Sequence, residues 1–431
     1  MFQKNLKQIL LLAVFIALIL RLIISATVFD GDVITQAEWG KWIYEHGLVG
    51  FYDENHWLNE WPNHPPLITI WYGFSYVIRS LIMGVLSNAG VFIANHHLGA
   101  GHLLWYFNFL KWFGSTKYQL TGLEVGIFYT IKLLPIVADI LIALLIFKLA
   151  EKISFRDALF FSLAYLFLPF SFYLSAVWGQ SDQVGALFTI LSFLALFKGN
   201  FLISPILLAI AIDLKPTSIL LLPLYFAACF IYRANLKKFS LGLVAAFLLI
   251  IFSFIIFTDN SYVNFILLKA PKTLFFNKTQ FISINAFNFW YIFYSNTKIL
   301  NSQTLFWVPA FFWSLIFFGI INLLGIFAIY HKDLKNLFLG IFIVISGGWL
   351  FLTNMYERYL FLGVLTLLIL SIYNKKLVKY FLIFSTIYFL NLYHGLVITS
   401  WMNSLIDFRV LLSLINVIVF FRIIKLGFSD I

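Results

Sequence analysis

The sequence predicts an all-α polytopic membrane protein. Of its 431 residues, 62% are hydrophobic and 20% aromatic, whereas only 11% are charged. A soluble globular domain carries about 25% charged and about 45–50% apolar residues, so a soluble domain is excluded. The 52 phenylalanines exclude disordered and collagen-like chains, and the single cysteine, Cys229, excludes a disulfide scaffold. The net charge of +11 would suggest a nucleic-acid partner in a soluble protein, but here the distribution of the charge along the chain carries the information.

The first predicted span covers residues 8–28. This run is apolar apart from Arg21 and is long enough to cross about 30 Å of hydrocarbon. Lys4 and Lys7 precede it, and neither the shorter core nor the cleavage site of a signal peptide is evident. We therefore expect an uncleaved first span with a cytoplasmic N-terminus.

Further apolar runs bring the prediction to about 12 transmembrane helices. With a cytoplasmic N-terminus, the loops assigned to the cytoplasm hold 16 of the 29 basic residues and four of the 18 acids, as the positive-inside rule requires. The other spans are expected at residues 123–147, 157–175, 183–198, 200–215, 217–232, 240–257, 304–329, 337–353, 359–373, 377–397 and 408–424.

The first outer loop, residues 30–122, is unusual because it contains two weaker apolar runs, 67–87 and 90–113. Arg79 interrupts the first run and three histidines interrupt the second. The parity of the other spans requires zero or two crossings here, so the runs form either a transmembrane hairpin or amphipathic helices along the outer face. The polar residues favour interfacial helices.

Polar residues that hydropathy does not explain fall in the loops on the outer side of this threading. Ionisable groups near bilayer depth are costly and usually serve a cavity or a path. Their position on one face suggests a shared active site. The clusters are Asp30 with Asp32, and residues 178–182, 213–216, 277–280, 285–288 and 354–358.

The residue types indicate the chemistry of such a site. Asp30 and Asp32 are the strong bases next to the first span, and a carboxylate there can accept a proton from a hydroxyl as a sugar is transferred onto it. A phosphate leaving group would need cations to stabilise its charge. The cations available for this role are Lys215, Arg358, Lys272 and Lys278.

Each cluster also has a structural interpretation. The two aspartates could be solvated loop acids, Lys215 could snorkel beside a helix-opening proline, and Glu357 with Arg358 could be a local ion pair. Trp178 could belong to an interfacial aromatic belt. Within the second span, we expect Lys132 and Asp139 to form a structural intramembrane pair.

Taken in order, these motifs resemble the GT-C superfamily of membrane glycosyltransferases, which use polyprenyl-phosphate-linked sugars. The likeness covers residues 21–360 and is greatest to the glucosyltransferases that extend the lipid-linked N-glycan precursor and to bacterial and archaeal mannosyltransferase relatives. The motifs are Gly31-Asp32 with Trp39, His64-Pro65-Pro66-Leu67, Lys132 with Asp139, residues 178–182, Leu214-Lys215-Pro216, residues 283–290 and Tyr356-Glu357-Arg358-Tyr359-Leu360.

The resemblance implies the GT-C fold, with juxtamembrane helices in the first outer loop. Residues 1–257 would form the conserved transmembrane module, 258–303 the second outer loop and 304–431 a variable transmembrane module. The active site would lie on the exoplasmic face. The compact loops suggest a prokaryotic cytoplasmic membrane.

The resemblance also implies a single-step inverting transfer of a hexose, mannose or glucose, from a polyprenyl-phosphate donor to an acceptor hydroxyl. The acceptor would be a lipid-linked glycan, a protein or another envelope component. Asp32 would be the base, with Asp30 as a second candidate, and Lys215 and Arg358 would bind the donor phosphate. Lys272 and Lys278 are further phosphate-binding candidates by residue type alone. Tyr356 stands where relatives have a histidine. The expected substrate-binding residues are Trp39, His64, Trp178, Gln180, Asp182, Asn285, Asn288, Tyr356 and Glu357.

We expect no cofactor, no metal and no nucleic-acid partner. Asp30, Asp32 and Glu357 could in principle hold a divalent cation, but the sequence lacks the Trp-Trp-Asp signature of the metal-dependent oligosaccharyltransferases. The alternative function is a transporter or flippase of polyprenyl-linked sugars, which should place polar groups at the midplane in broken helices.

Overall fold

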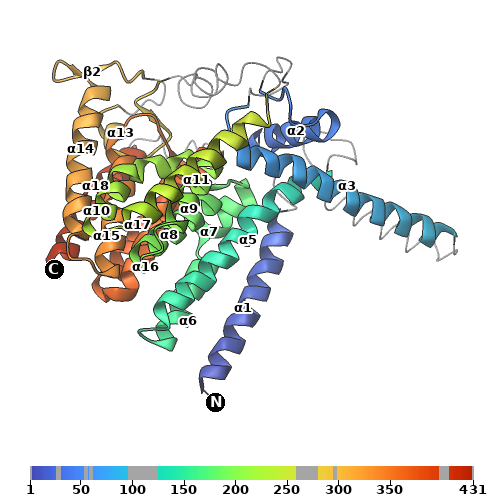
Figure 1. Ribbon diagram of the computed structural model, residues 1–431, viewed down its shortest axis with the longest axis horizontal. Coiled ribbons are helices and arrows are strands. Elements are labelled where there is room, and N and C mark those ends of the chain that lie inside the picture. The colour runs from blue at the N-terminus through green and yellow to red at the C-terminus, as the bar shows by residue number, and fades with distance from the viewer. Residues whose placement is uncertain are drawn as a thin grey trace.

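The computed structural model describes residues 2–25, 31–52, 57, 62–95, 125–258, 280–294, 299–397 and 407–429. Figure 1 shows a bundle of helices, with the short elements of residues 31–52, 280–294 and 299–309 at one end, here called the loop end. The N-terminus lies at the opposite end, at the tip of α1.

Helices dominate the described residues, as predicted. The first half contains α1 (Phe2–Ser25), α2 (Gly31–His46), α3 (Pro66–Asn95), α5 (Val125–Ala150), α6 (Phe155–Phe167), α7 (Pro169–Phe172), the π-helix η1 (Tyr173–Trp178), α8 (Asp182–Phe197), α9 (Ile203–Leu214), the 3-10 helix η2 (Pro216–Leu221), α10 (Leu222–Ile231) and α11 (Leu236–Ile255). The second half contains α13 (Phe289–Phe293), α14 (Ala310–Ile329), α15 (Leu334–Phe351), the 3-10 helices η5 (Glu357–Leu360) and η6 (Lys375–Leu377), α16 (Phe361–Tyr373), α17 (Val378–Val397) and α18 (Phe408–Ser429).

Two pairs of short strands accompany the helices. β1 (Ser283–Ile284) pairs in parallel with β4 (Met355–Tyr356), with Ile284 opposite Tyr356. β2 (Thr304–Leu305) and β3 (Val308–Pro309) form an antiparallel hairpin before α14. The first pair therefore joins two loops that are far apart in the sequence.

The long apolar helices are those of an integral membrane protein. Among the described residues, six helices are long and apolar enough to cross a membrane, and a seventh span results if α6 and α7–η1, bent by 48°, count as one. Several other predicted spans, such as α8 and α9, are helices of 16 and 12 residues. Such helices are only about 18–24 Å long, which is shorter than the hydrocarbon core of a bilayer, so their length does not show that they cross a membrane. The count of about 12 spans stays a prediction.

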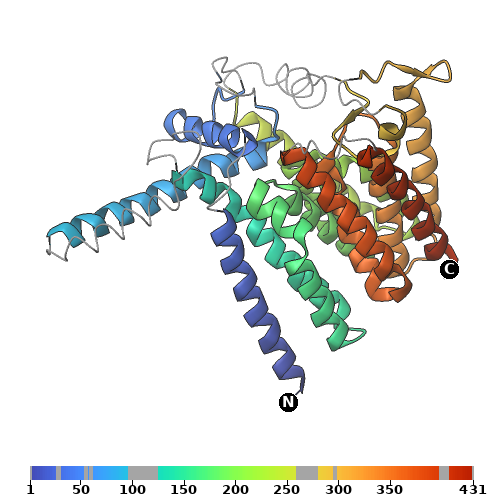
Figure 2. The same cartoon turned by 180° about the vertical axis from the view of Figure 1, so that it is seen from behind.

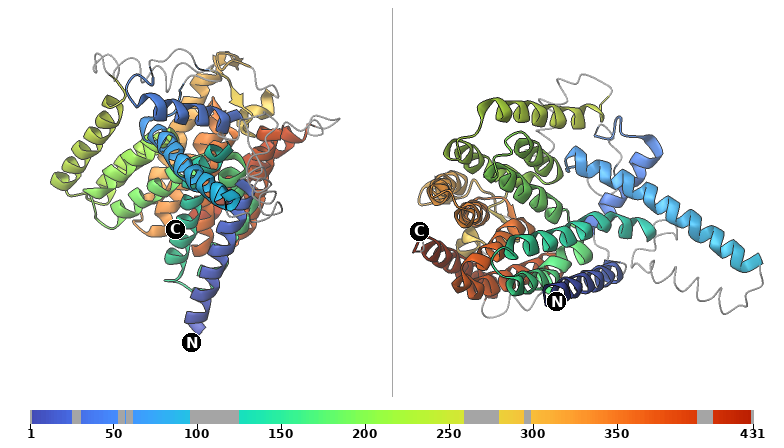
Figure 3. Two further views of the ribbon diagram at one scale, coloured as in Figure 1. Left: turned by 90° about the vertical axis from the view of Figure 1, so that its right-hand side faces the viewer. Right: turned by 60° about the horizontal axis from the view of Figure 1, so that its bottom comes forward.

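The segment predicted as the first outer loop contributes α2 and α3, which pack against each other beyond the end of α1. In Figures 1 and 3, α3 extends sideways out of the bundle, across the direction of α1 and α5. Gly40 and Gly73 permit the close packing, since a Cβ at these positions would come within 2.5 Å of the Tyr72 carbonyl oxygen and of Ile43 Cγ2. This placement agrees with an interfacial helix at 67–87; most of the run 90–113 lies outside the described residues.

A buried polar network joins α1 to α5 and to the bent helix. Arg21 Nε lies 3.1 Å from Asp139 Oδ2, and its Nη2 donates to Ser171 Oγ at 3.1 Å. Asp139 also accepts hydrogen bonds from Tyr165 and Ser175. The predicted pairing of Asp139 with Lys132 is wrong, because Asp139 pairs with Arg21, whereas Lys132 Nζ donates to the backbone carbonyl oxygens of residues 25, 176 and 177. The expectation of a structural role for Asp139 agrees with this network.

We expect removal of either partner of the Arg21–Asp139 pair to destabilise the protein by about 3–5 kcal/mol, since an uncompensated charge would stay buried. The variants Arg21→Met and Asp139→Leu would be compared by thermal unfolding in detergent. The double variant should lose less than the two single losses combined. Additive losses would contradict direct pairing.

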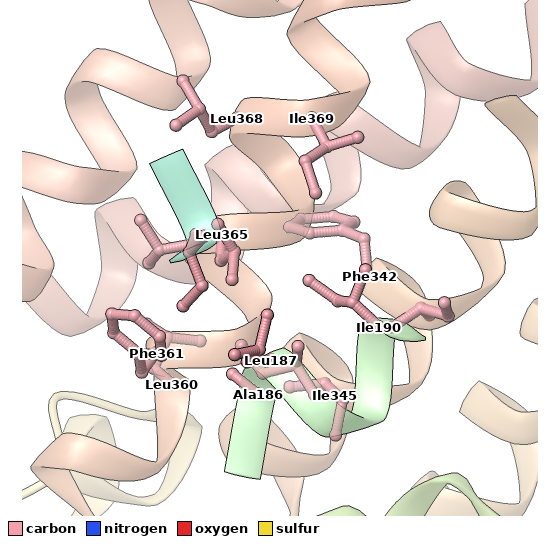
Figure 4. Close-up of a cluster of buried hydrophobic side chains, with 14 of the residues drawn as sticks. Ala186, Leu187, Ile190, Phe342, Ile345, Leu360, Phe361, Leu365, Leu368 and Ile369 are labelled. Atoms are coloured by element: carbon pink, nitrogen blue, oxygen red, sulfur yellow. The ribbon is translucent and has the colours of Figure 1, made fainter. Parts of the chain in front are cut away.

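One part of the hydrophobic core lies where α8, from the first half of the chain, packs against α15 and α16 from the second half. Figure 4 shows Leu187 and Ile190 of α8 against Phe342 and Ile345 of α15, with Leu365 of α16 beside them. All five are at most 6% exposed. This packing holds the start of α8 and the loop between α15 and α16 together, and both carry predicted site residues.

Candidate active site

A cavity of about 260 Å³ opens at the loop end of the bundle. Four segments that are distant in the sequence form it: the residues before α3, the start of α8, the α9–η2 junction and the segment that contains β4 and η5. Its lining combines two cations and two tyrosines with aliphatic side chains. The lining residues are Asn63, His64, Pro65, Ser181, Leu214, Lys215, Pro216, Thr217, Ile219, Leu220, Asn354, Met355, Tyr356, Arg358 and Tyr359.

Lys215 is the first of the two cations. It directly follows α9, and its Nζ lies 2.8 Å from Oδ2 of Asp182, the first residue of α8. Both side chains are under 10% exposed. Gly185 makes this approach possible, because a Cβ there would come 2.6 Å from Lys215 Cβ. The cation is thus held at the cavity wall by one buried carboxylate.

Arg358 is the second cation, and it lies among aromatic rings and carboxylates. Its guanidinium carbon is 4.8 Å from the ring centre of Tyr356 and 5.6 Å from that of Trp178. Nη1 lies 3.3 Å from Glu357 Oε1 and 3.7 Å from Asp32 Oδ2. Burial alone would lower the pKa of Arg358, but the two carboxylates outweigh it and raise the pKa above its ordinary value. Among the described residues, its buried Nε has no hydrogen-bond partner.

Asp32 is the most accessible carboxylate of this group. It lies in the first turn of α2, where the helix dipole favours an anion, and its Oδ2 accepts a hydrogen bond from Gln180 Nε2 at 2.7 Å. Its side chain is 43% exposed, whereas those of Asp182 and Glu357 are 4% and 3% exposed. Asp32 can therefore meet a group that arrives from outside, while the other two are positioned to hold cations.

The turn that carries Gln180 is fixed by Lys132. The π-helix η1 ends at Gly179, which has a φ of 77°. Lys132 Nζ donates to the carbonyl oxygens of Ala176 and Val177 at 3.1 and 2.9 Å. Its stem lies directly under Gly179, where an added Cβ would come 3.0 Å from Lys132 Cγ. A π-helix of this kind often marks a functional site, and here it aims Gln180 at Asp32.

Glu357 is buried between Arg358 and Gly395. Desolvation raises the pKa of this carboxyl, although the neighbouring guanidinium opposes the shift. A Cβ at Gly395 would lie 2.8 Å from Glu357 Cγ, so the glycine provides the space for the side chain. The arrangement stabilises the orientation of Arg358.

His64 and Trp39 lie on the α2–α3 side of the cavity. His64 lines it, with Nδ1 at 2.6 Å from Tyr72 Oη. Trp39 packs edge-on against the His64 ring at 5.3 Å and is 2% exposed. Trp178 is similarly buried, behind Arg358. In this structure both tryptophans support cavity residues and do not offer a free face to a sugar.

Asn285 and Asn288 lie behind the β1–β4 pair and stabilise their own loop. Asn285 has a φ of 56°, and its carbonyl oxygen accepts from Asn391 Nδ2 at 2.6 Å. Asn288 is fully buried and caps α13, accepting from the Tyr291 backbone N–H at 3.3 Å. Neither lines the cavity, so binding of substrate by these asparagines stays a prediction.

Three predicted site residues, Asp30, Lys272 and Lys278, lie outside the described residues. Within the described ranges, no group of three or more His, Cys, Asp or Glu side chains could hold a metal ion. The expectation of a metal-independent site stays a prediction.

Sequence reasoning did not name Tyr359 and Ser181 individually as site residues, although both belong to its motifs, and it missed Asn63 as a lining residue and Lys132 as a positioning residue. Tyr359 is part of the motif that contains Arg358, and a lysine inside an apolar span is itself a signal. Asn63 carries no comparable signal, because polar residues in loops are ordinary.

No protein-family model matches the chain, and no curated protein matches it. The resemblance to the GT-C superfamily therefore depends on the motifs named above.

Proposed function

We propose that the chain is an inverting glycosyltransferase that moves a hexose, mannose or glucose, from a polyprenyl-phosphate donor to an acceptor hydroxyl. One observation carries the proposal: an accessible carboxylate, Asp32, lies 3.7 Å from Arg358, and Arg358 lines a cavity together with a second cation, Lys215. A base and two phosphate-binding groups are what transfer from a phosphate-linked sugar requires.

The proposed reaction is a single displacement. Asp32 accepts the proton of the acceptor hydroxyl while the oxygen of that hydroxyl forms a bond to the anomeric carbon of the sugar. The bond from that carbon to the phosphate oxygen breaks, and its electron pair leaves with the polyprenyl phosphate. Lys215 and Arg358 stabilise the departing charge. The aliphatic part of the lining, including Ile219 and Leu220, supplies apolar surface next to these cations.

The finer architecture belongs to the same proposal. We assign the chain to the GT-C fold, with about 12 spans and an exoplasmic active site. The acceptor would be a lipid-linked glycan, a protein or another envelope component. The position of α2 and α3 at the loop end of α1 supports this assignment.

A transporter or flippase of polyprenyl-linked sugars is the second candidate, and one observation favours it. The bent pair α6 and α7–η1 is a broken helix next to the buried Arg21–Asp139 pair, which is a feature of transporters. However, the broken end carries Gln180 to Asp32, at the accessible end of the bundle. Transfer therefore explains more of the geometry than transport does.

The test is transfer of radiolabel by the purified full chain in sealed vesicles. Polyprenyl-phosphate mannose or glucose would be supplied with envelope extract as acceptor, with and without EDTA. Labelled product that is unaffected by EDTA would support the proposal. Movement of labelled lipid across the bilayer without any transfer would favour the flippase and overturn it.

A further inference from the structure

The hairpin that precedes α14 presents two aromatic residues at its tip. Phe306 and Trp307 form the two-residue turn between β2 and β3, and they are 71% and 95% exposed. Both have positive φ values, 49° and 63°. Such turns normally use Asn-Gly, since bulky side chains are strained in this region. The turn alone does not require aromatic residues.

Three hydrogen bonds hold the base of the hairpin in place. Trp313 Nε1 of α14 donates to the Leu305 carbonyl oxygen at 2.8 Å, and Tyr294 Oη donates to that of Thr304 at 3.0 Å. The Ala310 backbone N–H donates to the Gln303 carbonyl oxygen at 2.9 Å. The tip is therefore presented on a fixed base and not on a loose loop.

The hairpin continues directly into a helix with a lipid-type surface. α14 is a candidate span of 20 residues that is only about one third buried, and Phe312, Leu323 and Phe327 are at least 55% exposed. Residues 299–330 contain no charged side chain. Figures 1 and 2 place the hairpin at the end of α14, at the edge of the molecule and directed outward.

The length of α14 indicates that the headgroup region of a lipid bilayer surrounds the hairpin tip. Twenty residues of helix rise about 30 Å, which matches the hydrocarbon thickness of a bilayer. Tyr330, 69% exposed, follows the far end of α14, and Trp307 precedes its near end by three residues, or about 10 Å. Tryptophan and tyrosine prefer the two membrane–water interfaces, and these residues lie at the two corresponding levels.

We propose that Phe306 and Trp307 form an anchor that inserts into the lipid headgroup region on the cavity side of the membrane. Backbone hydrogen bonds connect the anchor to the segments next to the cavity. Asn301 N–H donates to the Gln280 carbonyl oxygen, and Asn354 N–H donates to that of Phe281, next to β1 and β4. Insertion of the tip thus sets the depth of the β1–β4 pair in the membrane. This inference does not depend on the proposed enzymatic activity.

The test measures the depth of a spin label on the full chain in lipid nanodiscs that hold one copy each. Cys229→Ala removes the sole native thiol, and nitroxides are attached in separate variants at Trp307→Cys and at Ser302→Cys, an exposed position near the base of the hairpin. Collisions with oxygen, which is concentrated in lipid, are compared with those of a water-soluble nickel chelate. We expect an oxygen-to-nickel ratio several-fold higher at position 307 than at 302.

A matched variant preserves the turn and removes the anchor. Phe306→Asn favours the same hairpin conformation, so in this background the oxygen-to-nickel ratio of the nitroxide at position 307 should fall while the ratio at position 302 stays unchanged. Equal nickel accessibility at 307 and 302 would overturn the proposal, since the tip would then be in water. Exclusion of both reagents at 307 would also overturn it, because protein would then cover the tip.

Discussion

Asp32→Asn is expected to abolish hexose transfer while leaving donor binding intact. General-base catalysis contributes about 10²–10⁴-fold, so kcat should fall by a factor in that range. The amide has nearly the same shape, and its oxygen can still accept the hydrogen bond that Gln180 donates at 2.7 Å. The KM for the donor should therefore change little. Steady-state transfer from a labelled polyprenyl-phosphate hexose measures both parameters.

The control for this variant is Asp157→Asn. Asp157 forms an ion pair with Lys375 at 3.0 Å, near the ends of α6 and α16 that lie away from the cavity. Transfer by this variant should match the wild type. Full activity of Asp32→Asn would remove the base from this position, and parallel measurement of Asp30→Asn would show whether the first aspartate performs the function instead.

Gln180→Ala should produce a smaller loss than Asp32→Asn, because it removes a positioning group and leaves the base in place. The carboxylate would retain Arg358 at 3.7 Å as its neighbour. A loss equal to that of Asp32→Asn would indicate that Gln180 itself contacts the substrate.

The sequence was sufficient to select several polar groups that the structure brings together. Charged residues stand out in an apolar chain because burying them is costly. That reasoning selected Asp32, Gln180 and Arg358, and the structure brings them together although 148 residues separate the first two. The helical class followed from composition in the same way.

The contacts between helices could not be predicted, since they depend on how the helices are rotated against one another. Asp139 meets Arg21 of another helix and not Lys132 of its own. The burial of Trp39 and of Asn288 has the same origin, because a residue type favourable for binding gives no information about which side it faces. Hydropathy placed α8 to within one residue, but it did not locate the turn before α9, which is 12 residues long and shorter than the predicted run 200–215.

Replacement of Arg358 should weaken transfer through the donor phosphate. Arg358 lines the cavity, and the fork of a guanidinium can bind two phosphate oxygens at once. Loss of one such oxyanion-stabilising group typically costs about 10²–10³-fold. We therefore expect Arg358→Gln to lower kcat/KM by a factor in that range, and Arg358→Lys to recover only part, since an ammonium lacks the fork.

The charge balance of the site requires a matched comparison. Arg358 lies between Asp32 and Glu357, so its loss leaves two carboxylates without the shared cation. The double variant Glu357→Gln with Arg358→Gln removes one negative charge as well and should unfold near the temperature of Glu357→Gln alone. Its transfer should nevertheless stay low, because the phosphate contact is still missing.

Inhibition by free polyprenyl phosphate separates binding of the phosphate from an effect on the base. If Arg358 holds the leaving group, the inhibition constant should rise in Arg358→Gln and in the double variant, and stay near the wild-type value in Asp32→Asn. An unchanged constant in Arg358→Gln, with kcat alone reduced, would assign Arg358 to the orientation of Asp32. The phosphate would then have to be held by Lys215, whose Nζ lies 2.8 Å from Asp182.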